Sequence, residues 1–103
     1  MATIITNDDG EMQMINKQAE MLFGWSRDDL LGQPVEKLIP EDRREWHRKV
    51  RAEYVKTPRQ FTIGDRQPLT CRRKDGSTFK AEIGLAPLHT DEGMLVMVNL
   101  LEV

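Results

Sequence analysis

The sequence predicts a small α+β domain in which helices cover one face of an antiparallel sheet. Three hairpin-like turns support the sheet, because Asp9-Gly10, Asp75-Gly76 and Glu92-Gly93 each separate two strand-like runs. Glycine tolerates the positive φ that a tight hairpin turn requires. From Thr78 to Leu85 polar and apolar residues alternate, which is typical of a strand with one buried face. The stretch between the first turn and the last two is mostly helical in pattern, and its helices must pack on the sheet to bury their apolar sides.

The first half of the chain begins with a hairpin over residues 2–15 and continues into short helices. Asn16 is a typical helix N-cap, and Gly24 suits the left-handed end of the same helix. A shortened capping box at Ser26 opens a second short helix. Pro34 opens a third helical turn, since proline is tolerated at the first helical position. We therefore expect several short helices in this region.

The longest helix is predicted to begin at Pro40 and to end near residue 55. Its apolar residues Trp46, Val50 and Tyr54 are four apart and form one narrow seam. Thr57-Pro58 ends the helix, because proline disfavours helix in the residue before it. A polar connector and three strands follow, roughly over residues 59–67, 68–74, 77–88 and 94–103.

Size and composition indicate one domain without internal disulfide bonds. The chain has 103 residues and a mass of 11.9 kDa, which is enough for a single core. Its net charge of -2 gives no general attraction to nucleic acid or to a membrane surface. The lone Cys71 excludes an internal disulfide and suits a reducing, cytoplasmic compartment. Because Met1-Ala2 leads almost at once into a strand, we expect residues 1–103 to be one domain excised from a larger protein.

A set of short motifs occurs in a fixed order along almost the whole chain. The motifs are Asp9-Gly10, Asn16, Leu22-Phe23-Gly24-Trp25, Leu30-Leu31-Gly32, Ile39-Pro40 and Arg73-Lys74-Asp75-Gly76. No single motif is specific, but the ordered set resembles the PAS domain (sensory box) family of bacterial signal transduction. The resemblance implies a five-stranded antiparallel sheet of order 2-1-5-4-3, with short helices and one longer helix covering one face. It also implies a sensory module joined to an output domain such as a histidine kinase.

The resemblance allows a flavin cofactor to be tested at particular positions. Light sensors of the family carry a photoreactive cysteine where this chain has Val35, so adduct chemistry is excluded there. They also hold the flavin ring through two asparagines and a glutamine on the last three strands. The corresponding residues here are Cys71, Ala81 and Leu100, which cannot supply amide hydrogen bonds. Covalent-adduct flavin is therefore disfavoured.

Haem is disfavoured on similar grounds. Haem oxygen sensors of the family place an axial histidine on or just after the long helix, where this chain has Glu53 and Arg59. His47 directly follows Trp46, so we expect it to lean away from the apolar seam as a surface histidine. His89 precedes a turn and is also expected at the surface. No cluster of residues has the spacing of a metal site, and no cofactor is predicted.

Cys71 has two readings. It shares the inward face of its strand with Leu69, which favours a small buried hydrophobe. The alternative is a redox sensor, because the nearby Arg72, Arg73 and Lys74 would lower a thiol pKa. Cys71 and Arg72 point to opposite faces of the strand, however, which weakens that alternative.

The inward-facing residues define a candidate pocket that is almost wholly apolar. The candidate residues are Leu22, Val35, Leu38, Ile39, Trp46, Val50, Cys71, Phe79, Ala81, Ile83, Val98 and Leu100. Leu69, Leu85 and Val96 share the inward face. Ligand pockets usually combine an apolar lining with a few placed polar groups, and these are hard to name here. The sequence therefore favours a core filled by its own side chains. The alternative is a small apolar cavity that holds a lipid-like molecule.

The opposite face of the last strand is also apolar. The outer residues are Ile5, Leu95, Met97, Asn99, Leu101 and Val103, with Asn99 as the polar break. An antiparallel sheet normally exposes one face to solvent, and monomers avoid large exposed apolar patches. In the family a flanking helix or a second copy covers this face. We therefore predict a homodimer through the outer sheet face.

Two rival functions find little support. The basic side of the long helix is interleaved with glutamates and aspartate, so a solvated face is favoured over nucleic-acid recognition. No nucleophile and base have a defensible spacing, so catalysis by this domain is not expected. No direct membrane contact is expected either. The sequence predicts a signal-relay module that dimerises and signals to a C-terminal histidine kinase or diguanylate cyclase. The alternative is a sensor of a small apolar molecule. Haem, flavin or redox sensing is less favoured still.

Overall fold

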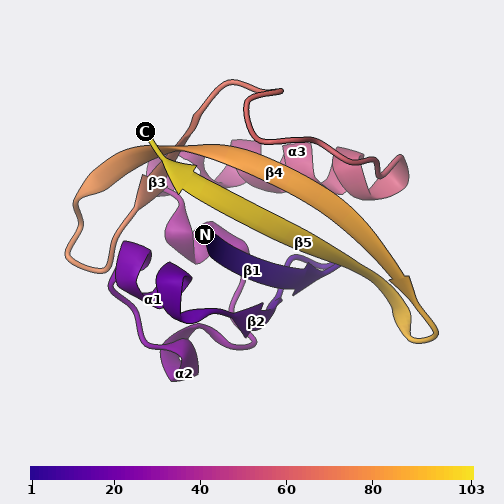
Figure 1. Ribbon diagram of the computed structural model, residues 1–103, viewed down its shortest axis with the longest axis horizontal. Coiled ribbons are helices and arrows are strands. Elements are labelled where there is room, and N and C mark those ends of the chain that lie inside the picture. The colour runs from indigo at the N-terminus through magenta and orange to yellow at the C-terminus, as the bar shows by residue number, and fades with distance from the viewer.

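The computed structural model describes residues 1–103 and confirms the predicted sheet. Its five antiparallel strands are β1 (Ala2–Asn7), β2 (Met12–Ile15), β3 (Leu69–Arg72), β4 (Thr78–Thr90) and β5 (Gly93–Glu102). They are ordered β2-β1-β5-β4-β3, so that the last strand is central (Figure 1). Ala2 lies opposite Leu100, which brings the two ends of the chain together. The three predicted turn glycines, Gly10, Gly76 and Gly93, all have positive φ.

The helical segments lie between β2 and β3 in the sequence. They are α1 (Lys17–Phe23), α2 (Arg27–Leu30), the 3-10 turns η1 (Val35–Leu38) and η2 (Glu41–Arg43), and α3 (Arg44–Lys56). α1 packs near β1 and α2 near β2, whereas α3 contacts η1 and η2 and runs alongside the β4 half of the domain (Figure 1). No helix has the length and apolar content needed to cross a bilayer.

The expected cap of the first helix is confirmed and also joins the helix to the sheet. The Asn16 side-chain oxygen accepts hydrogen bonds from the backbone N–H of Ala19 at 3.0 Å and of Thr3 at 2.9 Å. Gly24 ends the helix with φ of 77°. The Ser26 capping box differs from the prediction, since the Ser26 hydroxyl donates to the Asp29 carboxylate at 2.9 Å and caps no backbone N–H.

The long helix also differs from the prediction. Residues Glu41–Arg43 form a 3-10 turn, and α3 begins only at Arg44. No residue of α3 is buried, and Trp46, expected in the inward seam, is 53% exposed. The helix crosses the sheet without resting on a packed core.

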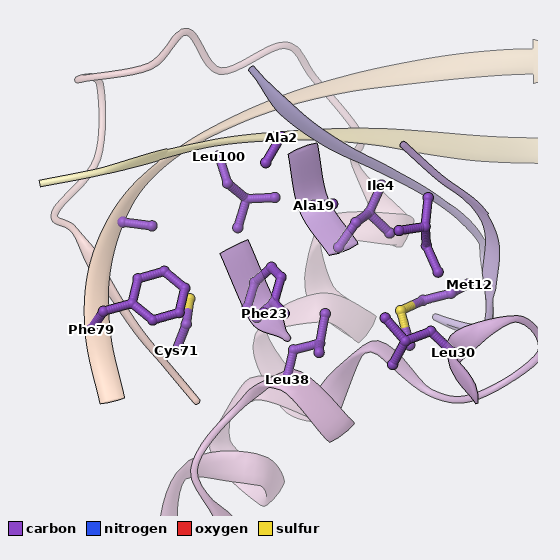
Figure 2. Close-up of a cluster of buried hydrophobic side chains, with 12 residues drawn as sticks. Ala2, Ile4, Met12, Ala19, Phe23, Leu30, Leu38, Cys71, Phe79 and Leu100 are labelled. Atoms are coloured by element: carbon purple, nitrogen blue, oxygen red, sulfur yellow. The ribbon is translucent and has the colours of Figure 1, made fainter. Parts of the chain in front are cut away.

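The packed core lies between the inner face of the sheet and α1, α2 and η1, with residues from all five strands. Phe23 and Phe79 pack together in this core with ring centroids 5.4 Å apart (Figure 2). The twelve clustered residues are Ala2, Ile4, Met12, Ile15, Ala19, Phe23, Leu30, Leu38, Cys71, Phe79, Ala81 and Leu100. Ile4, Phe23, Leu38, Cys71 and Leu100 of this cluster also border the space beneath α3.

The segment between α3 and β3, predicted as a polar connector, packs against β4. Phe61 and Leu85 exchange two backbone hydrogen bonds, each of 2.8 Å. Gly84 permits this approach, because a Cβ atom there would lie 3.3 Å from the Phe61 carbonyl oxygen and from Ile63 Cγ1. Phe61 consequently forms part of the wall under α3.

Candidate ligand-binding pocket

A pocket of about 640 Å³ lies between α3 and the sheet. This volume falls within the range of small-molecule sites. The lining comes from β1, η1, α3, the connector and the last three strands, and 17 of its 26 residues are hydrophobic. The structure thus differs from the filled core that the sequence favoured. The apolar side chains of α3 meet a gap instead of interlocking with the sheet.

Most of the predicted pocket residues line this space. Those that do are Val35, Leu38, Ile39, Trp46, Val50, Cys71, Ile83, Val98 and Leu100. Leu69, Leu85 and Val96 line it as well. Leu22, Phe79 and Ala81 do not, because Phe79 and Ala81 are buried in the core and Leu22 packs against it. Polar residues absent from the prediction, among them His47 and Arg51, complete the lining.

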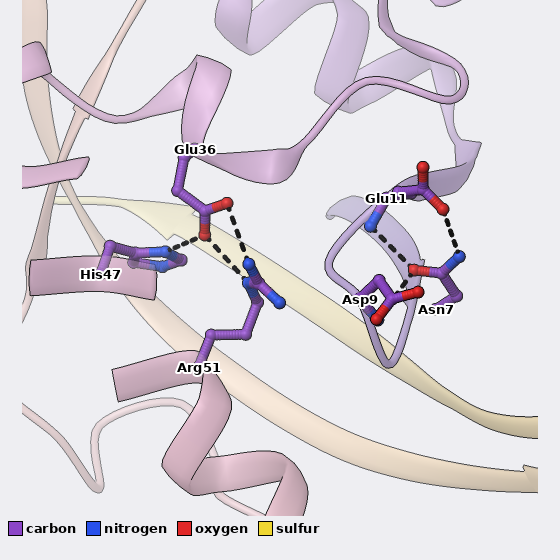
Figure 3. Close-up of polar contacts among 6 residues, drawn as sticks. All are labelled: Asn7, Asp9, Glu11, Glu36, His47 and Arg51. Carbon is purple, nitrogen blue, oxygen red and sulfur yellow. Dashed lines mark hydrogen bonds and ion pairs between the residues drawn. The ribbon is translucent and has the colours of Figure 1, made fainter. Parts of the chain in front are cut away.

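A buried carboxylate connects η1 to α3. Glu36 is 1% exposed, and one of its oxygens lies 2.6 Å from His47 Nδ1 and 3.0 Å from Arg51 Nε (Figure 3). Arg51 Nη2 donates to the other oxygen at 3.3 Å. Buried charges persist only when they are paired and hydrogen bonded. These three side chains therefore form one unit, which we call the Glu36 cluster.

The environment of Glu36 keeps it ionised. Burial alone would raise its pKa, but the hydrogen bonds and charges of His47 and Arg51 outweigh burial and lower the pKa from 4.5 to about 2. The carboxylate is thus charged throughout the physiological range. Its charge holds α3 against η1 at one end of the pocket.

Glu36 is not among the residues predicted for the pocket, and His47 does not lie where it was predicted. His47 was expected at the surface, but its side chain is only 19% exposed and faces Glu36. One signal was present, because His47 and Arg51 are four residues apart and so share a helix face beside the apolar seam. Their carboxylate partner lies in a 3-10 turn between apolar residues, where the helical period of 3.6 does not apply.

The first hairpin turn packs against the same cluster. A Cβ atom on Gly10 would lie 2.4 Å from the Arg51 guanidinium carbon. The turn is shaped by Asn7, whose side-chain oxygen accepts from the backbone N–H of Asp9 and of Glu11 at 3.1 and 2.9 Å (Figure 3). Gly10 also accepts a backbone hydrogen bond from Val35 at 2.9 Å. The Asp-Gly turn therefore leaves room for Arg51 to reach Glu36.

Cys71 lines the pocket as a protonated thiol. It is 1% exposed, and burial raises its pKa from 9.0 to about 12. The redox alternative requires the neighbouring basic side chains to lower this pKa. They do not, because burial raises it. Cys71 contributes a small apolar surface to the wall.

At the positions that the resemblance assigned to haem and flavin ligands, this chain carries no histidine and no side-chain amide. Glu53 is exposed on α3 and Arg59 lies on the pocket wall, and neither ligates haem iron. His47 lines the pocket, with its Nδ1 bonded to Glu36. His89 is exposed, and no three histidine, cysteine or carboxylate residues gather to hold a metal. Val35, Cys71 and Leu100 line the pocket without an amide, while Ala81 is in the core.

This sheet order, with helices on one face and a pocket beneath the longest, defines a sensory domain of the PAS type. The PAS domain family profile matches residues 1–102, and the chain belongs to that family. Sensor protein FixL of Bradyrhizobium diazoefficiens is 33% identical over 86% of the chain, which covers 18% of FixL. Oxygen sensor protein DosP of Escherichia coli is 27% identical over 88% of the chain, which covers 11% of DosP. The chain thus spans less than a fifth of either relative.

Solved structures agree on the fold. A PAS domain from Desulfitobacterium hafniense superposes with a TM-score of 0.83 at 14% identity, covering 99% of this chain and 92% of that one. At that identity the likeness extends to the fold alone. The predicted family and fold class are confirmed.

Replacing Gly10 should destabilise the domain through two separable effects. Gly10→Ala places a side chain at φ of 81° and pushes Arg51 off Glu36, whereas Gly32→Ala, at φ of 80° with no atom within 4 Å, carries the backbone strain alone. We expect Gly10→Ala to cost about 2 kcal/mol more than Gly32→Ala in urea unfolding, the value of hydrogen bonds to a charged group. In a Glu36→Gln background this excess should largely vanish. Equal costs for the two glycines in the wild-type background would contradict the packing role of Gly10.

Glu36 should make the free energy of unfolding depend on pH in the acid range. Because its pKa is lowered in the folded state from 4.5 to about 2, its contribution is present above pH 4.5 and is lost as the pH falls towards 2. The shift corresponds to about 3 kcal/mol at neutral pH. In urea unfolding followed by tryptophan fluorescence, Glu36→Gln should lower stability at pH 7 and flatten this acid dependence. The exposed Glu45→Gln is the control, and an unchanged pH profile in Glu36→Gln would overturn the assignment.

Proposed function

We propose that this PAS sensory domain binds a small, largely apolar molecule beneath α3 and passes its occupancy to an output domain through the sheet. The pocket of about 640 Å³, lined mainly by hydrophobic residues, carries this proposal. A ligand there would replace the apolar contacts that α3 lacks. Ligand binding thus takes precedence over the ligand-free relay that the sequence favoured.

The central strand gives a direct route for the signal. Val98 and Leu100 of β5 line the pocket, and the alternate residues Met97 and Leu101 face the opposite side of the sheet. A ligand that shifts the inner residues of β5 shifts its outer residues as well. The Glu36 cluster would resist movement of α3, so the sheet is the more compliant wall.

We further propose that the outer sheet face forms a homodimer. The strand register places Met14, Ile5, Met97 and Ala86 in one row across four strands. Leu101 and Val103 extend the apolar surface and are 47% and 63% exposed. Asn99, the polar break, accepts from the Thr3 hydroxyl at 2.8 Å and is thereby partly satisfied within the sheet. A second copy would cover this face as a sheet-on-sheet packing.

The output remains a proposal drawn from relatives. FixL and DosP are both named as sensors, and the chain corresponds to a small part of each. We propose that a C-terminal histidine kinase or diguanylate cyclase follows this domain in its parent protein, and that any catalysis lies there. The free thiol of Cys71 suits a cytoplasmic location.

Ligand binding can be tested on the purified domain. Native mass spectrometry and an absorbance spectrum should show a retained small molecule, or NMR titration with decanol should shift the signals of Ile83, Val98 and Leu100. Val98→Trp should abolish both effects by filling the pocket, while Thr78→Trp, at an exposed position of β4, should not. If no mass is retained and decanol shifts no pocket signal, the domain is a ligand-free relay. A strong visible band would instead indicate a chromophore.

Dimerisation can be tested by light scattering after size-exclusion chromatography. We expect a dimer at ~100 μM, well above micromolar dissociation constants. Met97→Lys should give a monomer, since it puts a charge in the centre of the outer row. Gln18→Lys, exposed on α1, is the matched control. A wild-type monomer at that concentration would overturn the homodimer.

A further inference from the structure

The connector brings two basic side chains to the mouth of the largely apolar pocket. Arg59 and Arg66 line the pocket, and their guanidinium carbons lie 4.5 and 4.8 Å from the centroid of the Phe61 ring. Both side chains belong to exposed residues, and neither guanidinium is paired with a carboxylate. Stacking on an aromatic ring orients a guanidinium while leaving its N–H donors free.

The backbone beneath these arginines is held in place. The Tyr54 hydroxyl donates to the Arg59 carbonyl oxygen at 2.6 Å, and Phe61 is hydrogen bonded to Leu85 of β4. The Asp65 carboxylate accepts from the Thr62 N–H at 2.7 Å and closes the turn before Arg66. The absent side chain at Gly84 lets the whole segment lie close to the sheet. The two cations are therefore presented by an ordered segment.

The charge of the lining favours a single negative group. Three arginines and one aspartate line the pocket, together with His47. Arg51 and His47 are engaged by Glu36. Among the lining residues Arg59 and Arg66 then exceed Asp65 by one positive charge, and the Glu82 carboxylate lies outside the lining beside Gly64. This local excess stands out in a chain whose net charge is -2.

We propose that the ligand of this pocket is an amphipathic monocarboxylate, with its apolar part beneath α3 and its carboxylate at Arg59 and Arg66. The inference rests on the proposed ligand-binding function and adds the chemical class of the ligand. Guanidinium groups bind carboxylates through paired, charge-assisted hydrogen bonds. The apolar chain would extend from this mouth towards Val98, Leu100 and Cys71 on the pocket wall.

Three ten-carbon probes separate charge from apolar burial. Decanoate, decanol and decyltrimethylammonium should be titrated into the wild-type domain by NMR, below their micelle concentrations and at low salt. We expect decanoate to bind about tenfold more tightly than decanol, because each of two exposed ion pairs contributes at most about fivefold in affinity. Decyltrimethylammonium should bind more weakly than decanol. Added salt should reduce the preference for decanoate.

A double variant assigns the preference to the mouth. Arg59→Gln with Arg66→Gln should bring decanoate to the affinity of decanol while decanol binding stays unchanged. Arg43→Gln with Arg48→Gln, two exposed arginines outside the pocket lining, should retain the preference. If decanol binds and decanoate shows no advantage, or if the advantage survives in the double variant, the inference is wrong and pocket binding stands. If neither probe shifts a pocket signal, both the inference and the proposed ligand binding fail.

Discussion

The pairing of one buried carboxylate determines how the longest helix sits on this domain. α3 contributes no buried residue, so apolar packing does little to fix its position. Glu36 supplies what packing does not, because an ionised group that is 1% exposed must keep its partners. Those partners, His47 and Arg51, are one helical turn apart on α3. The helix is therefore held by this charge cluster, together with hydrogen bonds from Arg44 to Ile39 and from Tyr54 to Arg59, while its inner side lines the pocket.

The pocket follows from that arrangement. The apolar residues that fill the core come from all five strands and the first helices, where the Asn16 cap and the Phe23–Phe79 contact order the chain. Under α3 the side chains of the sheet meet no matching layer, and a space of about 640 Å³ is left. The pocket is partly open to solvent, so its apolar lining stays in contact with water, which is unfavourable. A ligand that fills the space would remove this apolar surface from water, which gives the domain a physical reason to respond to it.

Much of the fold could be predicted from the sequence because its signals are local. The turn glycines require positive φ, and the alternation in β4 fixes which residues face inward, so the strands and most of the pocket wall were found correctly. The failures concern contacts between segments far apart in the chain. The burial of Glu36 depends on Arg51, fifteen residues away, and the burial of Phe61 depends on Leu85. Whether a core is filled or hollow depends on the summed volume of several elements, which no single pattern encodes.

The central strand joins the pocket to the proposed dimer face. Along β5 the residues that line the pocket alternate with those of the outer face, so one strand borders both the proposed ligand and the proposed partner. The pocket and the outer face are coupled only if the ligand binds the dimeric and monomeric forms of the domain with different affinity. The register supplies a basis for this difference, because Met97 lies between Ile5 and Ala86 while its neighbours Val96 and Val98 contact the pocket. A change in pocket volume that alters the twist of β5 would change the flatness of the outer row, and with it the fit to a second sheet.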